Sequence, residues 1–157
     1  MITLLVKKLS LFRQTFFKKI NKNFYSQFGE DRILDEIIPK DFYNGFYVDV
    51  GCFHPKKYSN TYMLFKRGWF GINIDMEEGK IDTFNIARPK DYNFLGAISD
   101  KVEKVKIYRN QKFGVSSTID PGILKKDDII DENFITTTTL DNVINNSPYK
   151  NKEIDLL

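Results

Sequence analysis

The sequence predicts an α/β fold in which helices flank a parallel β-sheet. Residues 45–98 alternate between strand, helix, strand, helix and strand, an order typical of parallel sheets with right-handed crossovers. The first two strands, GFYVDVG (45–51) and GINID (71–75), are nearly continuous apolar runs, as expected of strands that are buried on both faces. The third strand is expected over residues 92–98.

Start and stop signals place the helices of this region. Ser59 is the expected N-cap of the first connecting helix, and Gly68 would adopt the left-handed conformation after its last turn. The second connecting helix is expected over residues 77–88 and is stopped by Pro89. A further short helix precedes the first strand and ends at Pro39. The inward face of the second connecting helix would consist of Ile81, Phe84 and Ala87.

Beyond residue 98 the pattern is looser. Residues 102–108 and 113–118 are expected to form a hairpin, and the charged stretch 119–133 is expected to be a loop. A strand through the threonine run then enters a short helix at Asp141. Residues 154–157 have the pattern of the opening of another buried strand.

Basic residues are concentrated in the first 24 residues. This arm carries six basic residues and no acidic one, which leaves 18 basic against 21 acidic residues in the rest of the chain. A nucleic-acid binder would more often carry its basic surface on the folded body, so we expect no nucleic-acid partner. We therefore divide the chain into an N-terminal arm, residues 1–24, and a domain, residues 25–157.

Residues 2–22 of the arm have the spacing of an amphipathic helix, because apolar residues recur every three or four positions. A basic helix with an aromatic-rich apolar face is typical of a segment that lies on anionic lipid. Ordinary surface helices show the same stripe, so a helix docked on its own domain is the alternative interpretation. The stripe comprises Ile2, Leu5, Leu9, Phe12, Phe16 and Ile20.

The single cysteine, Cys52, excludes an intrachain disulfide and fits a reducing compartment. No apolar run approaches the length of a membrane span, and the N-terminal segment lacks the cleavage site of a signal peptide. We expect a cytoplasmic protein, with peripheral membrane contact through residues 2–22 under the lipid-binding interpretation.

One glycine follows the first strand. A dinucleotide pyrophosphate needs three glycines spaced G-x-G-x-x-G, whereas residues 51–55 read GCFHP, so an NAD site is disfavoured. S-adenosylmethionine carries no phosphate and needs one close approach to the backbone, which Gly51 would give. Asp49 would accept a hydrogen bond from its ammonium group, and Asp75, 26 positions further on, would accept both ribose hydroxyls. Alternatively, Asp49 caps a loop and Asp75 is an exposed strand-end charge.

Two further features of this region bear on catalysis. The helix start at Ser59, Asn60 and Thr61 would meet the carboxylate of the cofactor's methionine tail. His54 is the only histidine, and its ordinary pKa of about 6.5 suits a general base near neutral pH. Alternatively, His54 packs beside Pro55 and caps a backbone group. No Cys/His cluster has the spacing of a zinc site, and we expect no metal.

Several blocks of the chain resemble, in order, the landmarks of FkbM-type methyltransferases. The resemblance runs from Tyr25 to the last residue and implies a Rossmann-like class I methyltransferase fold. It also implies that S-adenosylmethionine is the cofactor and that the reaction is O-methylation of a sugar, polysaccharide or natural product. The landmarks are YSQFGED (25–31), GFYVDVGCFHP (45–55), YSNT (58–61), RGWFGINID (67–75), the helix ending at Arg88, GAIS (96–99), TTTLD (137–141) and IDLL (154–157).

The resemblance assigns cofactor-binding residues as well. It implies contacts at Asp49, Gly51, Asn60, Thr61 and Asp75, with Ala97 and Ile98 near the adenine. Members of this family usually continue after the IDLL block with an acidic strand end and the remaining strands. The resemblance therefore implies an incomplete parallel sheet that ends at the start of its fourth strand, next to the first strand.

Two alternatives to an active methyltransferase stay open. One is a non-catalytic truncated or split fragment that needs an oligomeric or complementing partner to complete its sheet. The other is an NAD-binding Rossmann enzyme.

Overall fold

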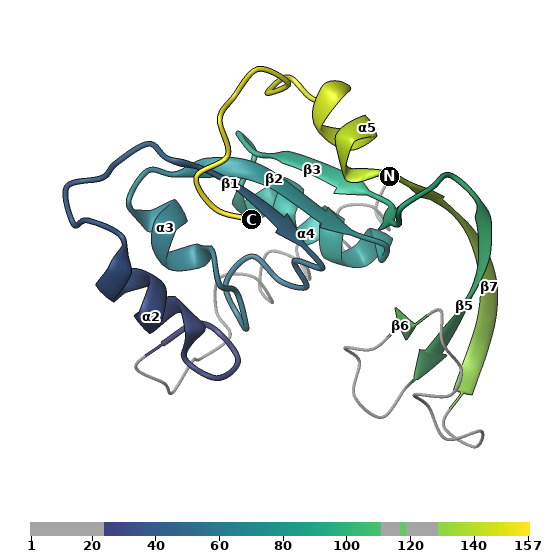
Figure 1. The fold of residues 1–157 in the computed structure, drawn as a ribbon. Coiled ribbons are helices and arrows are strands. Elements are labelled where there is room, and N and C mark those ends of the chain that lie inside the picture. Colours follow the sequence, from purple (N-terminus) through teal and green to yellow (C-terminus); the bar gives the residue numbers. More distant parts are fainter. Residues whose placement is uncertain (1–23, 111–116, 119–128) are drawn as a thin grey trace, which may run out of the picture. The chain divides into compact units, whose positions relative to one another are not determined.

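The computed structural model describes residues 24–110, 117–118 and 129–157 (Figure 1). The predicted arm helix, residues 2–22, lies outside the described residues, as do parts of the predicted hairpin and of the predicted loop. The described chain forms two compact units. The first comprises the residues up to Leu95 together with Ile144–Leu157, and the second comprises Gly96–Val143. None of the described helices is long and apolar enough to cross a membrane.

The first unit contains a parallel sheet, as predicted (Figure 1). Its strands are β1 (Phe46–Val50), β2 (Phe70–Asp75) and β3 (Tyr92–Leu95), and they pair in the order β1-β2-β3. Gly71 is required where β1 meets β2, because a Cβ atom at this position would lie 2.0 Å from the carbonyl oxygen of Tyr47. The apolar runs of the sequence therefore correspond to the centre of this sheet.

The described residues of the first unit form the helices α2 (Glu30–Ile37), α3 (Tyr62–Lys66) and α4 (Glu78–Ala87). α4 packs against β2 and β3 and buries Ile81 and Phe84, which confirms the predicted inward face at these two positions. α2 ends before Pro39, as predicted. Its apolar side chains are less covered than those of α4, since the large hydrophobic residues that stay exposed in this segment are Phe28, Ile33 and Ile37.

The first connecting helix is shorter than predicted. Ser59 is not its N-cap, because α3 begins only at Tyr62 and no side chain caps it. The hydroxyls of Ser59 and Thr61 bind elsewhere, since the guanidinium of Arg88 donates to both, at 3.0 and 2.9 Å. Gly68 does adopt the predicted left-handed conformation after the helix, with φ of +87°.

The last residues of the chain lie beside β1. Leu156 forms a parallel bridge with Tyr47, and the N–H of Val48 donates to the Leu156 carbonyl at 2.9 Å. Residues 154–157 therefore pair where the resemblance places a fourth strand. Their burial was predicted wrongly, since Ile154 and Leu157 are exposed. β1 thus has β2 on one side and this segment on the other, so the order of strands reverses direction at β1.

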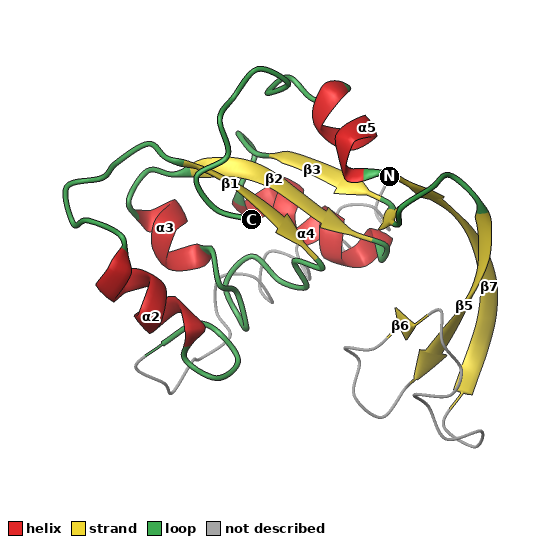
Figure 2. Cartoon of the chain, in the orientation of Figure 1, coloured by secondary structure: helices red, strands yellow, loops and turns green. Residues whose placement is uncertain are grey.

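The second unit is built around a long antiparallel ribbon of β5 (Lys104–Asn110) and β7 (Ile129–Thr138), drawn in yellow in Figure 2. The short strands β4 (Ala97–Ile98) and β6 (Ser117–Thr118) flank it in the order β4-β7-β5-β6. α5 (Leu140–Asn145) follows β7, close to the predicted start at Asp141.

The second unit corrects two predictions. The strand expected over residues 92–98 breaks at Gly96, and its last two residues pair with β7 instead of β2. Residues 129–133 were predicted as loop but belong to β7, which is also the main partner of β5. The predicted hairpin is confirmed over its described residues by the short antiparallel pairing of β5 with β6, in which Tyr108 lies opposite Thr118.

Candidate functional site

The predicted site residues of the first unit lie at the carboxyl ends of β1 and β2. Asp49 and Asn73 are register partners, and the N–H of Gly51 donates to the Ile74 carbonyl at 2.8 Å. Gly51 has φ of +74°, and no atom lies within 4 Å of the position that a Cβ would occupy. The backbone at Gly51 is therefore open to a ligand, and Asp49 and Asp75, at the ends of β1 and β2, lie near it in the fold.

Asp75 is a buried acceptor at this edge, with 6% of its surface exposed. Its carboxylate accepts the backbone N–H groups of Phe53 and Glu77 at 3.2 and 3.0 Å. The ammonium of Lys80 lies 3.3 Å from both carboxylate oxygens. Burial of this kind excludes the interpretation of Asp75 as an exposed strand-end charge.

Asp49 is held by a relay of hydrogen bonds. Thr61 donates its hydroxyl to Asp49 Oδ2 at 2.7 Å, and Arg88 donates to the same hydroxyl oxygen at 2.9 Å. Burial raises the pKa of Asp49, and the Thr61 hydrogen bond and the Arg88 charge oppose this rise. The carboxylate is thus oriented by its neighbours and stays close to the open backbone of Gly51.

Arg88 connects the loop between β1 and α3 to the sheet through hydrogen bonds. Only 1% of its surface is exposed, and its guanidinium donates to the Pro55 carbonyl, at 2.5 Å, and to the Tyr47 hydroxyl, at 3.0 Å. The Tyr47 hydroxyl in turn donates to Asp91 at 2.5 Å. Burial raises the pKa of Asp91, while its hydrogen bonds from Tyr47 and Asn73 lower it. Sequence reasoning named Arg88 only as the end of the second connecting helix and gave it no role in the site.

The loop after β1 is held in an uncommon backbone conformation. Phe53 and Tyr58 both have left-handed φ angles, of 54° and 58°, which bulky residues rarely adopt. Their rings stack with centroids 5.9 Å apart, and the Lys80 ammonium lies 5.2 Å from the Phe53 centroid. Each left-handed residue of this kind costs about 1–3 kcal/mol, so these contacts must hold the loop in place.

His54 lies in the same loop and makes local contacts. Its Nδ1 accepts the backbone N–H groups of Lys56 and Lys57, both at 3.0 Å. A ring nitrogen that accepts two N–H groups carries no proton, so the proton of a neutral ring lies on Nε2. This geometry agrees with the capping interpretation, and the role of His54 as general base stays a prediction.

The remaining predicted residues have diverse positions. Asn60 is exposed, directly before the buried Thr61. Ala97 and Ile98 belong to β4, in the second unit. Cys52 is buried against Ile81 and Phe84, and burial raises the pKa of its thiol, as is typical of a cysteine that packs in a core and does not react. Among the described residues, no group of three or more His, Cys, Asp or Glu side chains could hold a metal ion.

Asp31 is buried at the start of α2. It accepts the Ser26 hydroxyl at 2.6 Å and the Tyr25 N–H at 2.7 Å. Asp31 therefore fixes the turn that leads into α2.

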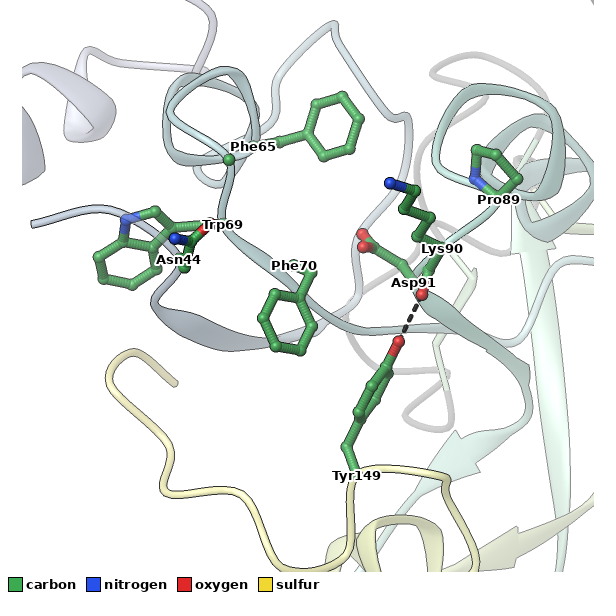
Figure 3. A pocket seen from close by; sticks show the side chains of 9 residues that line it. Asn44, Phe65, Trp69, Phe70, Pro89, Lys90, Asp91 and Tyr149 are labelled. Atoms are coloured by element: carbon green, nitrogen blue, oxygen red, sulfur yellow. Dashed lines mark hydrogen bonds between the residues drawn. The ribbon is translucent and has the colours of Figure 1, made fainter.

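A cavity of about 530 Å³ lies at the opposite, amino end of the sheet (Figure 3). Tyr149 donates its hydroxyl to the Lys90 carbonyl at 2.5 Å (Figure 3). Its ring packs edge-on against Phe46 and at a tilt against Phe70. Sequence reasoning did not predict this cavity, and it is separate from the cluster around Gly51. Its lining consists of Asn44, Phe65, Gly68, Trp69, Phe70, Pro89, Lys90, Asp91 and Tyr149.

No protein-family model matches the chain, and no match is found among curated proteins or solved structures. The site is therefore interpreted from its own geometry.

Proposed function

We propose that the first unit binds S-adenosylmethionine at the carboxyl ends of β1 and β2 and that the protein transfers its methyl group to a hydroxyl of a sugar, polysaccharide or natural product. The observation that carries this proposal is the open, left-handed Gly51, which follows Asp49 at the end of β1 and donates its N–H to Ile74, the residue before Asp75. The ordered sequence blocks that resemble FkbM-type methyltransferases support the same reading.

The strand order supports this location for a ligand. In open α/β sheets, ligands bind outside the carboxyl ends of the strands, where the strand order reverses direction. β1 is such a position, because β2 pairs on one side of it and Leu156 bridges to it on the other. Gly51 follows directly after β1 and is therefore at the expected point.

The donor and acceptor groups at this edge fit the nucleoside better than a dinucleotide. Asp75 is a buried acceptor of the type that binds paired ribose hydroxyls, and Asp49 is placed to accept from an ammonium group. A pyrophosphate would need several further close approaches of the backbone, whereas Phe53 and His54 follow Gly51 and Cys52. This difference favours S-adenosylmethionine over NAD.

When bound, S-adenosylmethionine would supply a methyl group for in-line transfer to an acceptor oxygen, with neutral S-adenosylhomocysteine as the leaving group. The chain's own contribution would be to bind and orient the nucleoside and to hold the loop 51–58 against it. Positioning of this kind contributes much of the rate of such displacements. His54 is the candidate that the sequence suggested for the base, but its Nδ1 accepts two backbone N–H groups and its proton lies on Nε2, so it would accept a proton only after these contacts break.

Calorimetry with S-adenosylhomocysteine and with NAD tests the proposal. We expect the first to bind and the second not to bind. Asp75→Ala should weaken the binding of S-adenosylhomocysteine by about 1–3 kcal/mol, because two ribose hydroxyls lose a charged acceptor. Asp41→Ala, which removes an exposed acid that precedes the amino end of β1, is the matched control.

The outcomes separate the alternatives. Tight binding of NAD without any response to S-adenosylhomocysteine would overturn the proposal in favour of an NAD enzyme. Binding of S-adenosylmethionine without methyl transfer to hydroxyl acceptors would favour the non-catalytic alternative.

A further inference from the structure

Lys80 lies inside the proposed nucleoside site. It is in the first turn of α4, and only 19% of its side chain is exposed. Its ammonium lies 3.3 Å from both carboxylate oxygens of Asp75 and 5.2 Å from the centroid of the Phe53 ring. The ammonium thus fills a position between a carboxylate and an aromatic face, both of which attract cations.

In this position the Lys80 ammonium occupies acceptor sites of the Asp75 carboxylate. An ionised carboxylate offers about four lone-pair sites. The N–H groups of Phe53 and Glu77 each occupy one oxygen, and the Lys80 ammonium spans both. Two ribose hydroxyls would need the acceptor sites that face Lys80. A nucleoside and the Lys80 ammonium therefore compete for Asp75.

The backbone of Lys80 is anchored, so the ammonium would stay close after displacement. The Lys80 N–H donates to the Glu77 carbonyl at 3.0 Å, and Thr83 donates its hydroxyl to the Lys80 carbonyl at 2.6 Å. Only the flexible side chain can move away. A ligand bound at Asp75 would consequently have a positive charge as a near neighbour, which disfavours a cationic ligand relative to a neutral one of the same shape.

We propose that Lys80 is a specificity-determining residue of this site. A nucleoside ligand replaces the Lys80 ammonium at Asp75, and the displaced charge discriminates against the positively charged sulfonium of S-adenosylmethionine relative to the neutral thioether of S-adenosylhomocysteine. This inference rests on the proposed function and adds the residue that sets the relative affinity of the two forms of the cofactor.

Calorimetry on the 157-residue chain with both ligands tests the inference. Lys80→Met should bind S-adenosylhomocysteine about threefold to tenfold more tightly than the wild type, because no ammonium has to be displaced. Its affinity for S-adenosylmethionine should rise by about a further threefold, so the preference between the ligands shifts toward the cation. Lys80→Arg keeps the charge and should retain the wild-type preference.

Lys152→Met is the matched control. Lys152 also holds its ammonium over an aromatic ring, 5.4 Å from the Phe70 centroid, but at the amino end of the sheet. Its removal should change neither affinity. Amide NMR spectra of each variant establish that it is folded, and Lys80→Gln replaces Lys80→Met if the latter does not fold.

The possible results are distinguishable. If the charge-neutral variant binds both ligands as the wild type does, or more weakly, Lys80 does not compete with the ligand and the inference is overturned while the nucleoside site stands. An equal gain for both ligands would overturn the discrimination by charge. If neither ligand binds to the wild type or to any variant, the proposed function itself fails, and the inference fails with it.

Discussion

Replacement of Arg88 by Met should be among the most destabilising single changes in the first unit. Arg88 is buried and donates four hydrogen bonds of 3.0 Å or less, two from each terminal nitrogen. These bonds connect the loop between β1 and α3 to the sheet. The acceptors are the hydroxyls of Tyr47, Ser59 and Thr61 and the carbonyl of Pro55.

The size of the stability loss depends on which hydrogen-bond partners each acceptor keeps after Arg88 is replaced. Tyr47 and Thr61 keep a partner in the Arg88→Met variant, because they donate to Asp91 and Asp49. The Pro55 carbonyl loses its Arg88 bond inside the protein, and Ser59 keeps only a long contact of 3.3 Å to Thr61. A buried polar group without a partner costs about 1–3 kcal/mol, so the expected loss is about 3 kcal/mol. For a chain of this length such a loss lowers the Tm by about 6–12 °C.

Urea unfolding followed by the fluorescence of Trp69 measures this loss. Trp69 is the only tryptophan and is 2% exposed in the core of the first unit, so its emission reports the integrity of this unit. Arg32→Met is the control, since Arg32 is an exposed residue of α2 and substitutions at such positions usually change stability by no more than about 0.5 kcal/mol. An Arg88→Met variant within about 1 kcal/mol of the wild type would refute the reasoning.

Further predictions concern the open glycine and the buried acid. Gly51→Ala should lower the free energy of unfolding in urea by about 1–2 kcal/mol, because Gly51 has φ of +74°. Gly79→Ala should be neutral or stabilising, since a Cβ at Gly79 also meets open space but belongs to a helix. Equal effects of the two changes would contradict the role of backbone conformation. Burial raises the pKa of Asp49 above the unfolded value of about 3.9, so the native state binds more protons and stability falls as the pH rises through the folded pKa. Asp49→Asn removes the ionisable group and with it this pH-dependent loss. As the pH rises from about 4 to about 7, the variant should therefore become more stable relative to the wild type, which unfolding curves at both pH values would show. A stability difference between variant and wild type that does not change with pH would argue against this prediction.

The sequence predicted the centre of the first unit because its signals are local. Apolar runs and the breakers Gly68 and Pro89 are sufficient to place β1, β2 and α4, and parallel pairing follows from their alternation. The position of Asp75 at a strand end was readable for the same reason. Its burial was not, because it depends on Lys80 and on the backbone of Phe53.

The failed predictions share a non-local cause. Ser59 has the residue type of an N-cap, but its hydroxyl binds Arg88, which lies 29 positions away in the chain. Residues 129–133 were predicted as loop because they are partly charged, whereas they pair along β5 in a ribbon where alternation of apolar and polar residues is weak. No single-sequence pattern identifies such partners.

Chemical-shift mapping with S-adenosylhomocysteine tests the central claim most directly. Addition of the ligand to isotope-labelled protein should perturb the amide signals of Gly51, Phe53 and Glu77 most strongly, because these groups surround the carboxylate of Asp75 and the open backbone after β1. Perturbations centred on Phe70 and Tyr149 at the amino end of the sheet, or no perturbation at saturating ligand, would contradict a nucleoside site at the carboxyl ends of β1 and β2.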